Sequence, residues 1–144
     1  MELDDLYQEI ILTHHKRPKN EGRLDPFCGM AEGYNPVCGD KVTVYVNGSD
    51  GKIVEVKFIG DGCAISRASA SIMTTILGNL TFDEALAKSD EFCKLLTGDE
   101  EPVVDLNEDG EVAALVGIRK FPGRIKCATL AWHAMEDALK DALK

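Results

Sequence analysis

The sequence has no long hydrophobic segment and relatively little positive charge. Its longest clean apolar run, Val112 to Ile118, is far shorter than the roughly 20 residues that a membrane-spanning helix needs. Lys and Arg total 16 against 25 Asp and Glu, so the formal net charge is −9. This balance argues against binding to a nucleic-acid backbone or to an anionic membrane. The acidic N-terminus lacks the apolar stretch of a signal peptide, so we expect a cytoplasmic location.

Several common cysteine and hydrolase motifs are also absent. No two cysteines have the C-x-x-C spacing of a zinc knuckle or of a dithiol redox pair. Five is an odd number, and without a secretory signal it argues against a disulfide framework. There is no G-x-S-x-G motif and no evident pair of nucleophile and base, so nothing supports a hydrolase. Any site built from thiols must be assembled by the fold from Cys28, Cys38, Cys63, Cys93 and Cys127.

The length suits one domain covering residues 1–144, and the sequence contains neither an internal repeat nor a linker. Apolar residues at helical spacing predict several helices. Pro18 ends the first, and Thr81 with Glu84 forms a capping box at the start of the third. The predicted helices cover residues 3–17, from near 63 or 66 to 77, 81–96, 111–118, and from about 125 to the end.

Two strands and two loops complete the expected fold. Alternating apolar residues predict strands over 42–46 and 54–58, with Val54, Val56 and Phe58 sharing the alternation. The turn residues at 47–51 join these strands into an antiparallel hairpin. Residues 17–37, rich in Pro, Gly and Asn, and the acidic residues 99–111 are predicted to be loops. The expected class is α+β, with a small antiparallel sheet covered by helices.

The first candidate site is Cys38-Gly39-Asp40, in a loop just before a strand. Gly39 allows the backbone to turn so that the thiolate and the carboxylate converge, and such a pair suits a tetrahedral metal. On its own, this motif is better explained as a turn that happens to contain a cysteine.

The other two candidates are cysteines at the starts of helices. Cys63 follows Gly60-Asp61-Gly62, and Cys127 lies in the first turn of the last helix next to Lys126. A helix N-terminus and nearby cations stabilise a thiolate. Considered alone, Cys127 is as well explained as a packed core residue.

Taken together, three thiols and one carboxylate predict a closed tetrahedral site for zinc or an iron–sulfur cluster, and argue against magnesium and calcium. The remaining candidates have simpler explanations. We interpret Cys28 as an incidental loop residue and Cys93 as a packed residue. The histidines lack a second metal-type residue four positions on, so they are interpreted as structural or surface residues: His14, His15 and His133.

Four segments carry a resemblance to a known family, in the order in which that family has them. These segments are Leu6-Tyr7 through His14 with Pro18-Lys19-Asn20, then Asn35-Pro36-Val37-Cys38-Gly39-Asp40, then Gly60-Asp61-Gly62-Cys63-Ala64-Ile65-Ser66, and finally Lys126-Cys127-Ala128-Thr129-Leu130-Ala131-Trp132. The chain resembles the IscU/NifU-N-like iron–sulfur assembly family. Within it, the chain is similar to the SufU branch, because Lys126 stands where the scaffold branch has a His and the stretch before Cys127 is longer.

The resemblance implies a zinc site made by Cys38, Asp40, Cys63 and Cys127. It also implies a sulfurtransferase, with Cys38 accepting persulfide sulfur from a pyridoxal-phosphate cysteine desulfurase of the SufS kind and passing it to downstream cluster-assembly proteins. Arg124 is expected beside the thiolates. Two alternatives remain at this point: a scaffold that holds a nascent [2Fe–2S] cluster on the same residues, and a structural zinc module with a binding role only.

Overall fold

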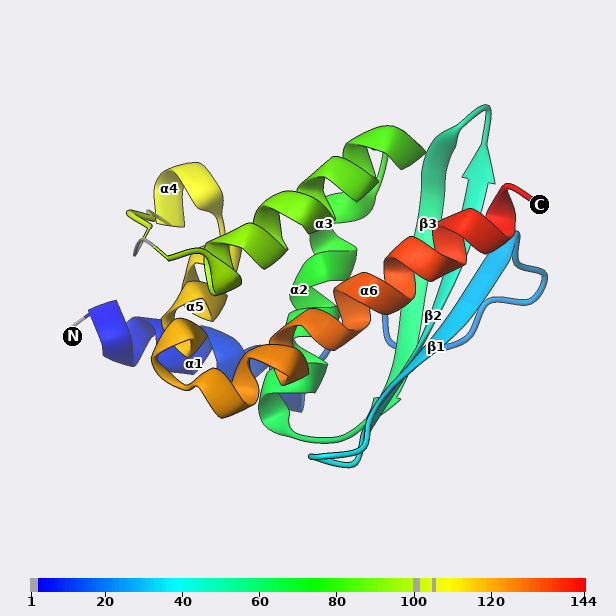
Figure 1. The fold of residues 1–144 in the computed structure, drawn as a ribbon. Helices are drawn as coiled ribbons and strands as arrows, with labels where there is room; N and C mark the ends of the chain where they lie inside the picture. Colours follow the sequence, from blue (N-terminus) through cyan, green and yellow to red (C-terminus); the bar gives the residue numbers. More distant parts are fainter. Residues whose placement is uncertain (1–2, 100–101, 105) are drawn as a thin grey trace.

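The computed structural model describes residues 3–99, 102–104 and 106–144. The chain forms an N-terminal helix, a three-stranded sheet and then a series of helices (Figure 1). In chain order the elements are α1 (Leu3–Lys16), β1 (Gly29–Asn35), β2 (Asp40–Ser49), β3 (Lys52–Asp61), α2 (Ala64–Leu77), α3 (Phe82–Thr97), α4 (Leu106–Asp109), α5 (Val112–Val116), the 3₁₀ turns η1 (Gly117–Lys120) and η2 (Pro122–Arg124), and α6 (Ile125–Ala142). Within the described residues, no helix combines the length and the apolar character needed to cross a bilayer.

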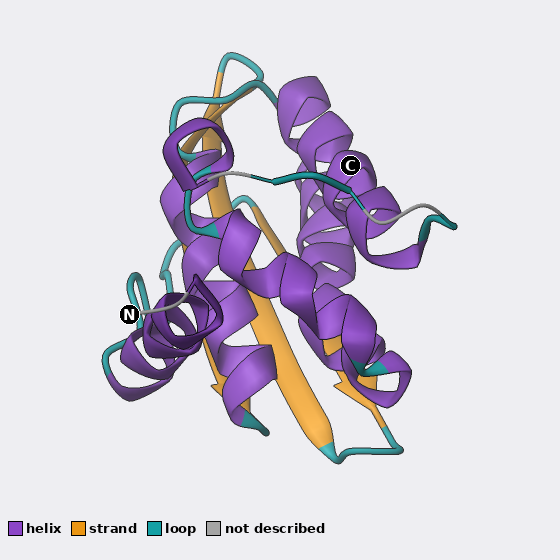
Figure 2. Cartoon of the chain, turned by 90° about the vertical axis from the view of Figure 1, so that its left-hand side faces the viewer, coloured by secondary structure: helices purple, strands orange, loops and turns teal. Residues whose placement is uncertain are grey.

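The strands form one antiparallel sheet in the order β1-β2-β3. β1 pairs with β2 so that Asn35 lies opposite Asp40, and β2 pairs with β3 so that Lys41 lies opposite Asp61. The helices gather on one side of the sheet, with α6 crossing β1 and β2 and α2 packed beside β3 (Figures 1 and 2). The predicted α+β class is therefore confirmed, and the pairing brings the ends of three strands to one edge of the molecule.

Strand β1 corrects the prediction that residues 17–37 are a loop. The segment contains Gly29 and Gly33, which are unfavourable in strands by propensity. Both glycines face α6: a Cβ on Gly29 would collide with the Ala138 carbonyl, and one on Gly33 would lie 3.0 Å from Leu130 Cδ1. Close packing of α6 on β1 therefore explains why this strand contains glycines, which in the sequence had suggested a loop.

The predicted hairpin is confirmed, although its turn is narrower and one side chain faces the other way. β2 continues to Ser49, and the register shifts between Asn47 and Gly48. Because a one-residue shift reverses which face a side chain occupies, Ile53 is buried and Val54 is 63% exposed. The expectation that Val54 shares the inward alternation of Val56 is therefore wrong.

The helix boundaries agree with the sequence signals. The Glu84 N–H donates to Thr81 Oγ1 at 3.0 Å and the Thr81 N–H donates to Glu84 Oε1 at 3.0 Å, which completes the predicted capping box. One difference is α4, a helical turn in the segment predicted as an acidic loop. Its end is set by Gly110, whose φ of +69° lets its N–H reach the Leu106 carbonyl at 3.0 Å.

The core fixes α6 against α2 and α3. The buried Trp132 ring stacks on Phe92 with centroids 4.4 Å apart, and its Nε1–H donates to Ser69 Oγ on α2 at 3.0 Å. Ser69 in turn donates to the Ala128 carbonyl. These contacts set the position of the first turn of α6, and therefore of Cys127.

Candidate metal centre

Three segments that are far apart in the sequence meet at one end of the sheet. They are the β1–β2 connection, the β3–α2 junction and the start of α6, which lie together at the lower edge of the molecule in Figure 1. In the connection, the Gly39 N–H donates to the Asn35 carbonyl at 2.8 Å, and Gly39 has a φ of +74° that favours glycine. This turn places Cys38 and Asp40 on the same side of the chain.

Cys38, Asp40 and Cys127 form the centre of the site. One ligand atom from each lies within 4.8 Å of the other two. The Cys38 and Cys127 sulfur atoms are 3.3 Å apart, and both thiols are free. Two sulfurs on a tetrahedral zinc lie about 3.8 Å apart, as follows from Zn–S bonds of about 2.3 Å. A shift of about half an ångström would therefore bring the two sulfurs to that spacing.

Cys63 contacts this group through Asp40. Its N–H donates to Asp40 Oδ1 at 2.8 Å, and its thiol donates to Asp40 Oδ2 at 3.6 Å. Cys63 is the N-cap residue of α2 with extended backbone, as its place at a strand-to-helix junction predicts. The Cys63 sulfur does not lie within 4.8 Å of the ligand atoms of all three residues Cys38, Asp40 and Cys127, so it lies at the edge of the cluster.

Gly62 is required by this contact. Its φ is +155°, and a Cβ at this position would collide with the Asp40 carboxylate. The glycine before Cys63 therefore allows the junction to approach Asp40 closely.

The electrostatic setting differs from the expectation that the helix start keeps Cys127 as a thiolate. Cys127 and Asp40 are fully buried. Burial is the largest cause that raises the pKa of the Cys127 thiol, followed by its hydrogen bonds with Cys38 and Asp40. Without a bound metal, burial and these neighbours oppose ionisation of the Cys127 thiol more than the helix start and the Arg124 side chain favour it.

Arg124 lies beside the thiols. A hydrogen bond with Cys127 is the largest cause that raises the pKa of the guanidinium, and the charges of Cys63, Cys127 and Cys38 add to it. The side chain is exposed to solvent, so it borders the cluster from outside.

Asn35 also borders the site, although no role is predicted for it from the sequence. This residue is buried, and its Nδ2–H lies 4.0 Å from Cys127 Sγ. Its side-chain oxygen accepts from the Val37 N–H at 3.2 Å, a local turn that the Asn35-Pro36 sequence favours. Asn35 thus links the shape of the Cys38 loop to the position of Cys127.

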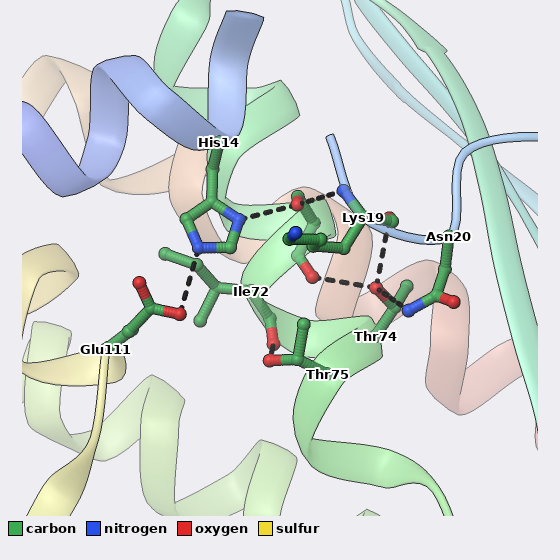
Figure 3. Close-up of polar contacts among 8 residues, drawn as sticks. His14, Lys19, Asn20, Ile72, Thr74, Thr75 and Glu111 are labelled. Atoms are coloured by element: carbon green, nitrogen blue, oxygen red, sulfur yellow. Dashed lines mark hydrogen bonds and ion pairs between the residues drawn. The ribbon is translucent and has the colours of Figure 1, made fainter. Parts of the chain in front are cut away.

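A second polar network surrounds His14. His14 is interpreted from the sequence as a structural or surface residue, and its contacts show that it is structural, but the network itself is not predicted. His14 is buried and bonds through Nδ1 to Ser71 Oγ at 2.6 Å and through Nε2 to Glu111 Oε1 at 3.0 Å (Figure 3). Ser71 also accepts from the Lys19 N–H at 2.7 Å. These contacts join α1 and the start of α5 to α2, and so support the helix that Cys63 caps.

The two remaining cysteines lie outside the candidate centre. Cys28 is exposed and its thiol lies 3.7 Å from the Gly48 carbonyl. Cys93 is partly buried on α3, near His133 of α6.

Comparison with known proteins finds relatives over nearly the whole chain. The chain is 41% identical over 138 residues to the iron–sulfur cluster assembly scaffold protein IscU of Streptococcus pyogenes serotype M1, which covers 96% of this chain and 85% of the relative. It is 43% identical over 136 residues to the zinc-dependent sulfurtransferase SufU of Bacillus subtilis strain 168, which covers 93% of this chain and 89% of that protein.

A solved structure gives the same result for the fold. The crystal structure of an iron–sulfur cluster assembly scaffold protein for the SUF system from Fervidobacterium islandicum AW-1 superimposes with a TM-score of 0.83 at 35% identity, over 96% of this chain and 99% of that one. Residues 6–128 match the NifU-like N-terminal domain, which includes all three cysteines of the candidate centre and Asp40. The chain therefore belongs to the family of NifU-like N-terminal domains, together with proteins named IscU and SufU.

Proposed function

We propose that this chain, acting as one domain over residues 1–144, is a zinc-dependent sulfurtransferase of iron–sulfur cluster assembly. It accepts persulfide sulfur from a SufS-type pyridoxal-phosphate cysteine desulfurase and passes it to downstream assembly proteins. The relative at 43% identity carries the name of this activity. The observation that carries the proposal is the contrast between Cys38, partly exposed on a loop, and Cys127, fully buried 3.3 Å away.

The donor set fits a zinc ion. Three thiols and one carboxylate match the ligands and the number of positions of a closed tetrahedral site, and Asp40 already contacts Cys63 while Cys38 contacts Cys127. These four residues would hold the metal. When bound, zinc supplies the positive charge that keeps the buried sulfurs deprotonated. Arg124 borders the same sulfurs and adds a further positive charge.

The transfer is a thiol exchange that needs no external oxidant. The Cys38 thiolate attacks the outer sulfur of the desulfurase persulfide, a new S–S bond forms on Cys38, and the S–S bond within the desulfurase breaks. The desulfurase cysteine leaves as a thiolate and takes up a proton. Cys38 suits this role because it lies on a turn, whereas Cys63 and Cys127 belong to the starts of helices.

The surface next to Cys38 is suited to a protein partner. Val37 is 83% exposed and Tyr34 is 62% exposed, so apolar side chains surround the loop that carries the thiol. Exposed apolar groups beside a reactive residue favour contact with another protein over free solvent. This supports delivery of sulfur by a docked desulfurase.

The main alternative is a scaffold that assembles a [2Fe–2S] cluster on the same residues. It is favoured by the relative at 41% identity, which is named a scaffold protein. Metal content alone separates the two roles poorly, because thiolate sites accept both zinc and iron.

The discriminating experiment measures sulfide or alanine formation by the desulfurase with catalytic amounts of this protein. A sulfurtransferase raises the turnover of the desulfurase many-fold, whereas a scaffold or a structural zinc module leaves it near the basal rate. The matched control is Cys28→Ser, which removes an exposed thiol outside the centre. Failure of the zinc-loaded protein to stimulate the desulfurase would reject the proposal.

A further inference from the structure

A separate group of polar side chains, some of them of types that bind metals, lies where α3 packs on α6. It consists of Ser89 and Cys93 on α3 and His133 and Glu136 on α6, and we call it the Cys93–His133 cluster. Its residues come from different helices, none of them part of the candidate centre. The stacked rings of Phe92 and Trp132, each one residue before a member of the cluster, hold the two helices in register. This packing in the core therefore places Cys93 opposite His133.

The contacts orient the imidazole of His133. Its Nδ1 lies 3.4 Å from Glu136 Oε2, while Ser89 Oγ donates to Glu136 Oε1 at 2.6 Å. Because a carboxylate oxygen accepts hydrogen bonds, this contact favours the His133 tautomer with the proton on Nδ1, which leaves the lone pair on Nε2. That lone pair is 3.9 Å from Cys93 Sγ. A carboxylate that holds the far nitrogen of a histidine is the usual support of a metal-bound imidazole.

The separation of the two donor atoms fits a metal ion better than a direct bond. A sulfur and a nitrogen on one tetrahedral zinc lie about 3.6 Å apart, given Zn–S of about 2.3 Å and Zn–N of about 2.05 Å. The observed distance between Cys93 Sγ and His133 Nε2 is 3.9 Å, so a small side-chain movement would bring the two atoms to the spacing on a zinc ion. The same distance is long for a hydrogen bond. We propose that Cys93 and His133 form a second, weaker site for a zinc-like divalent cation, with Glu136 positioning the imidazole.

A nucleophilic thiol is the competing explanation, because Cys, His and Glu also occur in that order in catalytic sites. Burial and the nearby Glu136 charge raise the pKa of the Cys93 thiol to about 11. Near neutral pH the thiol is therefore protonated, and the cluster does not present a free thiolate. Binding of a cation would displace that proton to solvent.

The site has open positions and favourable charge. The His133 side chain is 58% exposed, so water or a ligand from another molecule can complete the coordination. Glu136 and Asp90 add negative charge near Cys93. Two protein donors bind a metal less tightly than four, so the candidate centre fills first.

The test uses protein carrying one equivalent of zinc, titrated with Co²⁺. Zinc binds such ligands more tightly than cobalt, so the first equivalent stays in place. We expect a second equivalent to bind with the absorption band of a thiolate bound to Co²⁺. His133→Asn, a change at an exposed side chain, and Cys93→Ser should abolish this band. Glu136→Gln should weaken binding about 10- to 100-fold.

The control is Cys28→Ser, which should keep the band. No second equivalent with a thiolate band, or a band that persists in Cys93→Ser and His133→Asn, would overturn the proposal. Zinc content and stimulation of the desulfurase are measured on the same samples. Loss of zinc binding and of stimulation would reject the function proposed above. The cobalt band at the second site is a separate measurement, so that result stands or fails on its own.

Discussion

Asp40 holds Cys63 by two contacts of one carboxylate. Oδ1 accepts from the Cys63 N–H at 2.8 Å, and Oδ2 accepts from its thiol at 3.6 Å. The carboxylate therefore has a structural role at the start of α2 in addition to its proposed role as a metal ligand. The two roles can be separated by substitution.

Replacing Asp40 with Ala should weaken zinc binding without abolishing it, because three thiolates remain. Asp40→Asn keeps an oxygen for the Cys63 N–H but removes the negative charge, so it should preserve stability better than Asp40→Ala. Both should open one coordination position. Competition with a chelator measures zinc affinity, and Asp61→Ala, an exposed residue, is the control. Equal zinc affinity of wild type and both Asp40 variants would rule out Asp40 as a ligand.

The second prediction identifies the thiol that receives sulfur. Cys38→Ser should fold, retain zinc weakly and lose stimulation of the desulfurase, because Cys38 lies partly exposed on a turn rather than at a helix start. Cys28→Ser and Cys93→Ser should keep the zinc of the candidate centre and the stimulation.

Mass spectrometry checks this assignment directly. After brief incubation with desulfurase and cysteine, the added sulfur should be found on the peptide that contains Cys38. Sulfur found mainly on Cys63 or Cys127, or full activity of Cys38→Ser, would contradict the assignment.

The third prediction concerns removal of zinc. A ligand at 100 times its Kd stabilises the folded state by about 2.7 kcal/mol, and 1 kcal/mol shifts the Tm of a domain of this size by roughly 2–4 °C. We expect chelation to lower the Tm by about 5–10 °C, because the metal would link three separate segments. Differential scanning calorimetry measures the shift. An unchanged Tm after verified metal removal would show that the site adds no stability.

The fourth prediction tests the close approach at Gly62. Gly62→Ala should push the Asp40 carboxylate away, since a Cβ there would collide with it. We expect a loss of about 1–3 kcal/mol in the free energy of unfolding, together with weaker zinc binding. Urea unfolding and metal titration provide both values. Gly117→Ala is the matched control, because a Cβ at that position would meet nothing within 4 Å outside its chain neighbours and its own helical backbone, and it should lower neither the free energy of unfolding nor the zinc affinity.

Local signals in the sequence determined the elements whose cause is local. The capping box of Thr81 and Glu84 needs only residues three positions apart, and the strand alternation of β2 comes from its own side chains. Cys38 and Asp40 were paired for the same reason, because a turn at Gly39 brings them together. Cys63 was placed at a helix start by the two glycines before it.

Only the tertiary structure decided features that depend on distant partners. Gly29 and Gly33 belong to a strand because α6 packs on them, and nothing in residues 17–37 by itself shows that helix. Cys127 lies 3.3 Å from Cys38 although 89 positions separate them in the sequence. Sequence spacing specifies the local backbone, whereas the register of α6 on α2 and the sheet is set by packing of the whole core. That packing is the physical reason why the third thiol reaches the site.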